Sequence, residues 1–573
     1  MPLWVFARRQ LVNRKLSSKD TAILIEGSWP DDTQSLARSS LDDSIDGGFE
    51  WIDRQAAEFS DLLGAGGISP AYLNALALRY YLVKLLRVVA FFTEIRPLQP
   101  NECVELTAEE HDEDYADVLS RLCLAAGATL RVRWVDDRSG GRGGFPPNAP
   151  WRRWAGRLTN LLAPPPDRGG TPRVVLCGNP RLLDPLCREL LARGCNLWWL
   201  YDRFAFRSWA RWQSTGVRQL VCDSNLGREN RLSVEVPRRL HCRGVNLAAP
   251  VERWLCQRTQ THGRRQTRLI EQMDEHFRRV KPDALVLDED ATPMARAAVA
   301  VGRRHAIGSL VVQHGVPCCR FGFAPPAADR VLAWGRSSRE QLIRWGVPPE
   351  QIRITGPTCS YARQSVVLEG NRPRILMLTS VPPRDGRPDA VALQMTGRSY
   401  AEMLRTAFST VAGIAGAELI VKLHPRCPDD PVVRELRADF PRLNVQVVKN
   451  QPFQKWLGMV ACVLSCGSSA GVEAAAAGVP VIQLLPSGSN DLLPHDEWGM
   501  LATARTEAEL QPLLARVLVE GWRPPAGPDP NVFARFDVSS IVRIADEVLD
   551  VASARHQLQP GRPSNAARVK VKS

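Results

Sequence analysis

The 573-residue sequence contains very little lysine: only nine of its 74 basic residues are lysine, and the others are arginine. Arginine presents a planar fork of N–H donors that suits phosphate groups, so this bias fits a phosphate-binding protein, although a GC-rich coding sequence produces the same bias. The formal net charge is +13. That charge permits phosphates, nucleic acid or an anionic membrane surface as partners, and the lack of a repeated basic and aromatic pattern speaks against nucleic acid.

The sequence also lacks the markers of export, of a membrane-spanning segment and of a cysteine-based metal-binding site. Its 14 cysteines include the vicinal pair Cys318 and Cys319 but no C-x-x-C spacing, so we expect reduced, buried thiols. The N-terminal apolar run ends at two arginines after Ala7, and no run reaches the roughly 18 residues of a span. We therefore expect a soluble, cytoplasmic protein. The apolar segment Ala71–Phe92 predicts a buried or amphipathic helix, with peripheral contact at the inner face of the cell membrane as the alternative.

Several common catalytic patterns are absent as well. The sequence has no P-loop spacing, no G-x-G-x-x-G and no H-E-x-x-H. NTP hydrolysis, hydride transfer and zinc proteolysis each lose their usual sequence support. The acidic run 109–114 resembles a metal cluster only superficially, because consecutive acids point in different directions, and we expect it to be a solvated face.

What the sequence does contain is a rhythm of short β-rich runs and helical patterns, interrupted by two segments rich in proline, glycine and arginine, 136–172 and 357–373. This rhythm predicts an α/β fold with two Rossmann-like parallel-sheet domains that face one another across a cleft. Strands are also expected in the N-terminal region, which either forms a domain of its own or extends the first sheet. The expected division is an N-terminal α/β region 1–172, a first domain 173–356, a second domain 371–556 and a mobile basic tail 557–573, with N-terminal strands at Thr21–Glu26, Glu102–Thr107 and Thr129–Val135.

The strongest motif is a strand that runs from Cys462 into a turn of small residues and then into a helix. Ser468 and Ser469 stand at the predicted helix start, where backbone N–H groups bind phosphate. Gly471 would let a ligand approach, and Glu473 could accept hydrogen bonds from ribose hydroxyls. The alternative is an ordinary capped helix of a parallel αβ unit.

A second motif lies upstream, where an apolar strand ends in Lys422, His424 and Arg426. We expect this strand to be the direct neighbour of the one before Ser468. Neighbouring strand ends of a doubly wound sheet lie over the same crevice, so these three side chains could face the groups bound at Ser468 and Ser469. They would then form an anion pocket, in which His424 is a candidate catalytic residue as well as a phosphate ligand. The alternative for His424 is a structural role beside Pro425.

Two further motifs could supply a general base. Asp288 and Glu289 close a predicted strand at 284–287, and His314 follows the next one in the sequence QHGVP. Asp290 completes a D-x-D pattern with Asp288, which in a metal-dependent GT-A transferase holds a divalent cation. The simpler alternative is that Asp290 caps the helix that follows.

In this order the motifs resemble the GT-B glycosyltransferases, where a nucleotide-sugar donor binds mainly to the C-terminal domain and the acceptor to the N-terminal one. The segments 312–357, KLHP and SCGSSAGVEAAAAGVPVI look more narrowly like bacterial capsule and surface-polysaccharide transferases and teichoic-acid glycerophosphotransferases. The resemblance spans about 283–485. His424-Pro425 and Ser468-Ser469 also match pairs of bacterial sialyltransferases, which implies phosphate binding, although Asp290 replaces the glycine that follows their acidic pair.

The resemblance implies a transferase that moves a sugar from a nucleotide-activated donor to a bacterial surface polysaccharide or lipid-linked glycan. No cofactor or metal is implied, and peripheral membrane association is an expectation. The alternatives are a nucleotide-sugar 2-epimerase, a glycerophosphotransferase of the same fold and a non-catalytic scaffold. The expected donor ligands are Lys422, His424, Arg426, Ser468, Ser469, Gly471 and Glu473, and the expected bases are Asp288, Glu289 and His314.

Overall fold

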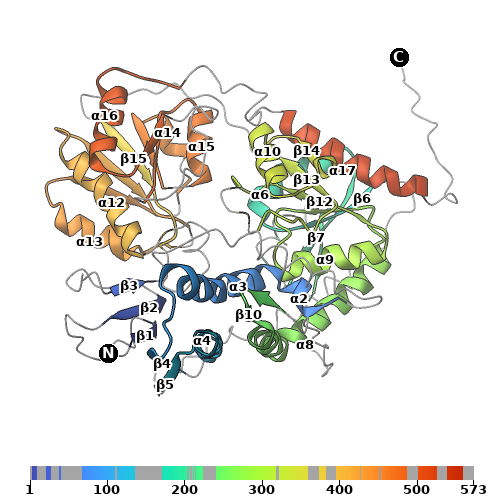
Figure 1. Cartoon of the computed structure of the whole chain (residues 1–573). Helices are drawn as coiled ribbons and strands as arrows, with labels where there is room; N and C mark the ends of the chain where they lie inside the picture. The colour runs from blue at the N-terminus through green and yellow to red at the C-terminus, as the bar shows by residue number, and fades with distance from the viewer. Residues whose placement is uncertain are drawn as a thin grey trace, which may run out of the picture.

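The computed structural model of the chain is shown in Figure 1. It describes residues 3–8, 21–26, 38–40, 68–109, 112–135, 171–202, 206, 210, 212, 215–222, 240–317, 320, 322–358, 373–382, 395, 397–425, 427–449, 451–452, 454–466, 468–486, 501–524 and 539–558.

The N-terminal region forms a parallel sheet of its own, with five strands in the order β3-β2-β1-β4-β5. Three of the strands confirm the sequence prediction. β1 is an unpredicted strand, because its short apolar run becomes a strand only through pairing with the more distant β2 and β4. The elements of this region are β1 (Leu3–Arg8), β2 (Ala22–Glu26), β3 (Arg38–Ser40), α2 (Pro70–Leu73), α3 (Ala75–Ala90), the π-helix η4 (Phe91–Ile95), β4 (Cys103–Glu109), α4 (Glu113–Ala126) and β5 (Thr129–Val135).

The middle sheet has seven parallel strands in the order β14-β13-β12-β11-β6-β7-β8. Its central strands β6 and β11 are buried and, apart from Arg173 at the start of β6, apolar, as a helix-covered parallel sheet requires. The elements are β6 (Arg173–Cys177), α6 (Pro180–Ala192), β7 (Asn196–Tyr201), β8 (Arg218–Val221), the hairpin β9 (His241–Cys242) and β10 (Val245–Asn246), α8 (Ala248–Val280), β11 (Ala284–Leu287), α9 (Pro293–Arg304), β12 (Gly308–Val312), β13 (Arg330–Ala333), α10 (Arg336–Arg344), the 3₁₀-helix η6 (Pro349–Gln351) and β14 (Ile352–Ile354).

The C-terminal sheet has six parallel strands in the order β17-β16-β15-β18-β19-β20. Together the sheets confirm the predicted fold class, an α/β protein with parallel sheets in separate domains. The remaining elements are β15 (Arg374–Leu378), α12 (Gly397–Ala412), β16 (Glu418–Lys422), α13 (Pro431–Asp439), β17 (Asn444–Val448), α14 (Gln454–Leu457), β18 (Cys462–Ser465), α15 (Ser469–Ala476), β19 (Val481–Leu484), β20 (Ala502–Ala504), α16 (Glu507–Leu518) and α17 (Ser539–Leu558).

Each large sheet is wound in two directions from its centre. In the middle sheet the chain passes from β6 outward to β8 and then returns to β11, which pairs with the other side of β6. In the C-terminal sheet the same reversal separates β15 from β18. Ligands of doubly wound sheets bind outside the carboxyl ends of the strands at this reversal point. The topology therefore marks the ends of β6 and β11, and of β15 and β18, as the places to look for a site.

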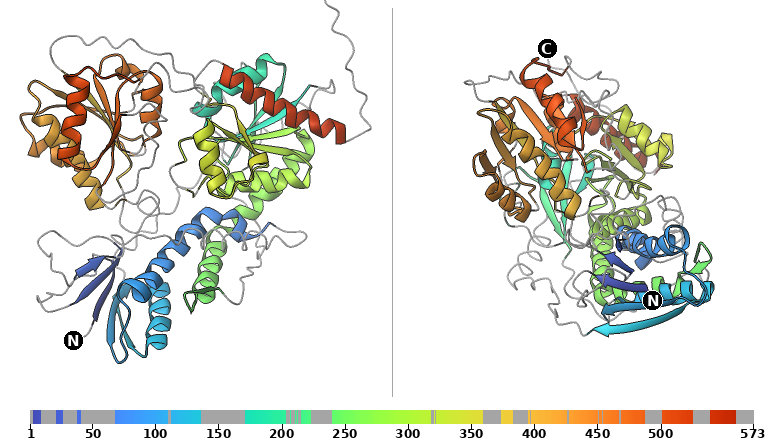
Figure 2. Two further views of the ribbon diagram at one scale, coloured as in Figure 1. Left: turned by 45° about the horizontal axis from the view of Figure 1, so that its top comes forward. Right: turned by 60° about the vertical axis from the view of Figure 1, so that its left-hand side comes forward.

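Helix α17 corrects the expected domain division. The sequence assigns residues up to 556 to the second domain, but α17 packs against α6, β11 and β12 of the middle sheet (Figures 1 and 2). Its apolar side chains Ile544 and Val548 are buried in the core of that sheet. Arg330 at the start of β13 pairs with Glu547 at 3.0 Å. The described helix ends at Leu558, so all but the first two residues of the predicted tail lie outside the described residues.

Helix α8, 33 residues long, joins the N-terminal region to the middle sheet. Leu255 near its start is buried in the N-terminal core, whereas Phe277 near its end is buried in the core of the middle sheet. Asn74 and Gln266 add a buried reciprocal pair of hydrogen bonds between the chain segment before α3 and α8, at 3.4 and 3.2 Å. These contacts fix α3 and α8 relative to one another.

The acidic run at 109–114 is not the solvated face that the sequence predicts. Glu109 and Asp112 are only 6% and 2% exposed, and the backbone N–H of Glu109 donates to Oδ2 of Asp112 at 3.2 Å. Asp114 accepts from Nε of Arg253 on α8 at 3.0 Å. The prediction was wrong for Glu109 and Asp112, which are buried, whereas Glu113 is exposed and residues 110 and 111 lie outside the described residues. Glu113 and Asp114 pair with Arg253 of α8, a long-range contact that the local sequence does not reveal.

Eight of the eleven described cysteines are buried, and all eleven are free thiols. The predicted buried thiols are thus confirmed for these eight. Burial raises the pKa of Cys195 to about 11, which makes its thiolate scarce at neutral pH. Within the described ranges, no helix is long and apolar enough to cross a membrane.

The position of α17 gives a first prediction. Because Ile544 is buried in the core of the middle sheet, Ile544→Ala should lower the free energy of unfolding of that unit by about 2–5 kcal/mol. Hydrogen exchange followed by mass spectrometry should show faster exchange in β11 and β12 and unchanged exchange in β15 and β16. Val542→Ala on the same helix, where the side chain is 39% exposed, is the matched control. Faster exchange confined to the C-terminal sheet would contradict the assignment.

Candidate functional site

Asp288 lies at the reversal point of the middle sheet. Oδ2 of its carboxylate, which follows β11, accepts the backbone N–H of Asn179, which follows β6, at 2.7 Å. Gly178 has φ +145°, and a Cβ atom there would lie 1.9 Å from Oδ1 of Asp288. Only glycine fits this backbone conformation and this close approach. The carboxylate is therefore held across the two central strand ends.

The surroundings of Asp288 change its acidity. Burial raises the pKa of Asp288, the Asn179 N–H and the nearby His314 oppose this rise, and Glu289 adds to it. A carboxylate whose pKa moves toward neutral pH is a better proton acceptor in a general-base step. Because its burial is partly opposed by a hydrogen bond and a nearby histidine, it also stays ionised over a wider pH range than a fully desolvated carboxylate. Asp288 thus has the position and the environment of a general base.

Asp290, in contrast, has a structural role. Its side chain is 3% exposed, and its Oδ2 accepts the backbone N–H groups of Ala327 and Ala328 at 2.5 and 2.9 Å. It does not cap the next helix, because the cap of α9 is Thr292. The D-x-D interpretation needs both carboxylates directed at one cation, and Oδ2 of Asp290 is directed at backbone amides. In the described part of the chain, no group of three His, Cys, Asp or Glu residues could hold a metal ion.

The turn after β12 is held by Gln313, a residue whose role the sequence reasoning missed. Its side-chain oxygen accepts the N–H of Trp334 at 2.8 Å, and its amide donates to the carbonyl oxygen of Gly315 at 2.8 Å and to Oγ of Ser338 at 3.0 Å. His314 is exposed beside this rigid turn and stacks on Phe323, with ring centroids 4.7 Å apart. The imidazole can therefore reach a ligand while its backbone stays fixed.

The helix start predicted to bind phosphate also lies at a reversal point. Ser468 is the N-cap of α15, with its Oγ accepting the N–H of Ala470 at 3.3 Å, and Ser469 is the first helical residue. A Cβ atom on Gly471 would lie 2.5 Å from Oγ of Ser465 on β18. Gly471 is therefore required for close packing of the helix on the strand, and its role in ligand approach stays a prediction. Glu473 is half-buried on α15.

Lys422 is the last residue of β16, and His424 follows it. Strand β16 is separated from β18 by β15. The expectation that their strand is the direct neighbour of the one before Ser468 was therefore wrong. Thr379, after β15, connects the two segments: its Oγ1 accepts the His424 N–H at 3.1 Å, and the preceding Leu378 carbonyl accepts the N–H of Cys466 at 3.2 Å. Burial lowers the pKa of half-buried Lys422. Arg426 lies outside the described residues.

The carboxyl ends of the two large sheets come into contact. A Cβ atom on Gly315, after β12, would lie 3.7 Å from Oγ and 3.9 Å from Cβ of Ser469. Next to this contact, Val316 and Trp334 are buried in one apolar cluster with Val472 and other residues of the C-terminal sheet. The structure thus brings the His314 turn to the start of α15, two features that the sequence placed in different domains.

No known protein-family model matches the chain, and no curated protein matches it. Among solved structures it resembles a putative UDP-N-acetylglucosamine 2-epimerase from Listeria monocytogenes, at 13% identity over 69% of this chain and 98% of that one, with a TM-score of 0.43. It also resembles the lipopolysaccharide outer core galactosyltransferase WaaB, at 12% identity over 66% and 99%, with a TM-score of 0.43. It resembles MurG of Acinetobacter baumannii as well, at 13% identity over 66% of this chain and 99% of that one, with a TM-score of 0.36. At these scores the likenesses do not bear on function, which rests on the residues of this chain.

Asp288 gives a second prediction. Because the pKa of Asp288 is raised on folding, its ionised form costs stability above that pKa, and the cost disappears below the unfolded value of about 4. Asp288→Asn should therefore raise the melting temperature at pH 7, by an amount that shrinks toward pH 4. Thermal unfolding across this pH range measures the effect.

The control for this experiment is Glu520→Gln, which alters an exposed carboxylate and should leave the melting temperature unchanged at every pH. A loss of stability in Asp288→Asn that is larger at pH 7 than at pH 4 would contradict the account, since it would mean that the charged form is favoured by folding.

Proposed function

We propose that the protein is a GT-B-type glycosyltransferase that moves a sugar from a nucleotide-activated donor to a bacterial surface polysaccharide or lipid-linked glycan. The observation that carries this proposal is the contact between Gly315 and Ser469, which places the carboxyl ends of two doubly wound sheets against one another. A nucleotide bound at one reversal point would then present its sugar to groups at the other.

The donor would bind at the start of α15. Backbone N–H groups and the positive end of the helix dipole favour the diphosphate there, with the hydroxyls of Ser468 and Ser469 beside it. Lys422, His424 and Arg426 would add positive charge, and Glu473 would accept hydrogen bonds from the ribose. Thr379 supports this set because it holds the His424 backbone against the end of β15.

The acceptor hydroxyl would lose its proton to a base on the middle sheet. Asp288 is the favoured base, since its carboxylate is fixed by Asn179 and its pKa is raised by burial. His314 is the second candidate, because it is exposed and lies close enough to Asp288 to lower the pKa of that carboxyl group. Glu289 raises the pKa of Asp288 and would act through it.

Charge that grows on the leaving phosphate would be stabilised by the start of α15 and by the cationic side chains at the end of β16 and directly after it. Fixed dipoles and charges in a site of restricted water access are an effective way to stabilise such a transition state. In this proposal His424 contributes most in the transition state, so it would affect kcat more than KM. Metal independence belongs to the proposal as well.

Glu473→Ala gives a third prediction and tests the donor site. Loss of hydrogen bonds from ribose hydroxyls to a charged acceptor should weaken nucleotide binding about 10- to 150-fold. The measurement is calorimetric titration of the purified protein with UDP-, CMP-, CDP- and GDP-linked sugars, with and without EDTA. Glu520→Ala, at an exposed carboxylate outside the site, is the control and should bind like the native protein.

The proposal fails if no nucleotide sugar binds to the native protein. Strong inhibition of sugar transfer by EDTA, recovery of transfer on addition of Mn²⁺, and loss of transfer in Asp290→Asn would together point to the metal-dependent transferase class. Conversion of a nucleotide sugar to an isomer without any acceptor would favour a 2-epimerase. Transfer of a polyol phosphate would favour a glycerophosphotransferase, and unchanged glycan production in a host carrying Glu473→Ala and His424→Ala would favour a scaffold.

A further inference from the structure

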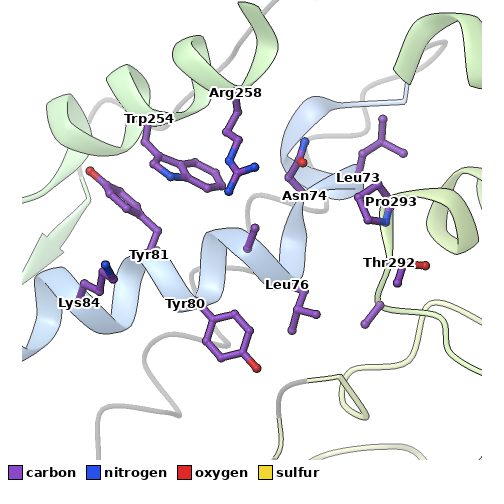
Figure 3. Close-up of a pocket in the computed structure, with 12 residues that line it drawn as sticks. Leu73, Asn74, Leu76, Tyr80, Tyr81, Lys84, Trp254, Arg258, Thr292 and Pro293 are labelled. Carbon is purple, nitrogen blue, oxygen red and sulfur yellow. The ribbon is translucent and has the colours of Figure 1, made fainter. Parts of the chain in front are cut away.

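A cavity of about 390 Å³ lies away from the contact between the two large sheets, at the junction of the N-terminal region and the middle sheet (Figure 3). One wall is the half-buried face of α3, with Tyr80, Tyr81 and Lys84. The opposite wall is α8, with Trp254 and Arg258. This volume falls within the range of about 300–1,000 Å³ that small-molecule sites occupy.

The aromatic wall is rigid before any ligand binds. The rings of Tyr81 and Trp254 stack at a centroid distance of 5.1 Å and an interplanar angle of 18°. The Tyr81 hydroxyl donates to the carbonyl oxygen of Pro250 at 3.0 Å, which fixes the ring against α8. Tyr80, the preceding residue of α3, also lines the cavity, and its ring points away from the rings of Tyr81 and Trp254 (Figure 3). Such a surface suits the apolar C–H face of a sugar ring, since that face loses little by leaving water.

Arg258 supplies positive charge without a carboxylate beside it in the described part of the chain. Its guanidinium lies over the Trp254 ring at 5.2 Å and contacts Nε2 of His262 at 3.3 Å. Arg253, five residues earlier on the same helix, is instead paired with acids of α4. Burial lowers the pKa of Arg258, and no acid opposes that effect. A half-buried cation of this kind is stabilised when an anion enters the cavity.

The cavity is also close to the proposed base. Its third wall consists of residues 291–293, which follow the acidic cluster directly. Three residues of extended chain span at most about 11 Å, so Asp288 and Ala291 lie within that distance. The wall formed by residues 291–293 therefore lies near Asp288, which makes the cavity a candidate extension of the acceptor site.

We propose that this cavity binds an anionic sugar, a pyranose ring that carries a carboxylate or phosphate, through charge pairing with Arg258 and contact with the aromatic side chains that line the cavity. Its assignment as part of the acceptor site rests on the proposed function, whereas the binding itself does not. Lys84 lines the same cavity and adds to its positive charge.

The experiment is saturation-transfer-difference NMR of the full-length protein with four probes: glucuronic acid, glucose 1-phosphate, neutral glucose and inorganic phosphate. Glucuronic acid and glucose 1-phosphate should each bind at least tenfold more tightly than neutral glucose or inorganic phosphate. Arg258→Gln should weaken the anionic sugars tenfold or more, Arg258→Lys should retain part of the affinity, and neither should change glucose binding. Arg304→Gln, at an exposed arginine of α9, is the matched control.

Equal binding of glucose and glucuronic acid, or full affinity in Arg258→Gln, would overturn the proposal. The nucleotide titration is repeated on Arg258→Gln: retained nucleotide binding with lost anionic-sugar binding supports both sites. Absence of nucleotide binding in the native protein would overturn the proposed function alone. n-Octyl β-glucuronide separates two sources of the anionic sugar, because tighter binding than glucuronic acid indicates a lipid-linked saccharide and equal binding indicates a free or polymeric one.

Discussion

The contact between the turn after β12 and the start of α15 is the constraint on which the account of this protein depends. Gln313 fixes the turn through Trp334, Ser338 and the Gly315 carbonyl. Gly315 has no side chain to keep Ser469 away. A buried apolar cluster beside the contact, to which the middle sheet contributes Val316 and Trp334, holds the two sheet edges together in the described structure. Burial of apolar area of this kind favours the joined arrangement.

The topology of the two large sheets determines where the other candidate site residues lie relative to this contact. Both large sheets reverse direction at their centres, and the polar groups that could take part in catalysis stand at those reversals: Asp288 on one side, Ser468 on the other. Helix α17 returns to the middle sheet, so the chain crosses between the units twice. The N-terminal sheet contributes differently, since its helix α3 and the long α8 enclose the aromatic cavity next to the acidic cluster.

Much of the fold was predictable, because buried parallel strands leave continuous apolar runs and their ends are marked by polar residues such as Asp288, His314 and His424. Strand order was not predictable, since it depends on pairings between distant segments, and so β15 was not expected between β16 and β18. The roles of Asp290 and α17 were misjudged for the same reason. The cavity could not be predicted from the sequence, because Tyr81 and Trp254 are far apart along the chain and come into contact only in the folded protein.

The most direct test of the account is a disulfide between the two sheet edges. A Cβ atom at Gly315 lies 3.9 Å from Cβ of Ser469, within the range of about 3.5–4.5 Å that disulfides require. The variant Gly315→Cys/Ser469→Cys should form this bond under mild oxidation, detected as a cross-linked peptide that is absent from both single variants. The bond should weaken nucleotide-sugar binding, and reduction should restore it. A double variant that stays unlinked, or that links without affecting nucleotide-sugar binding, would contradict the account.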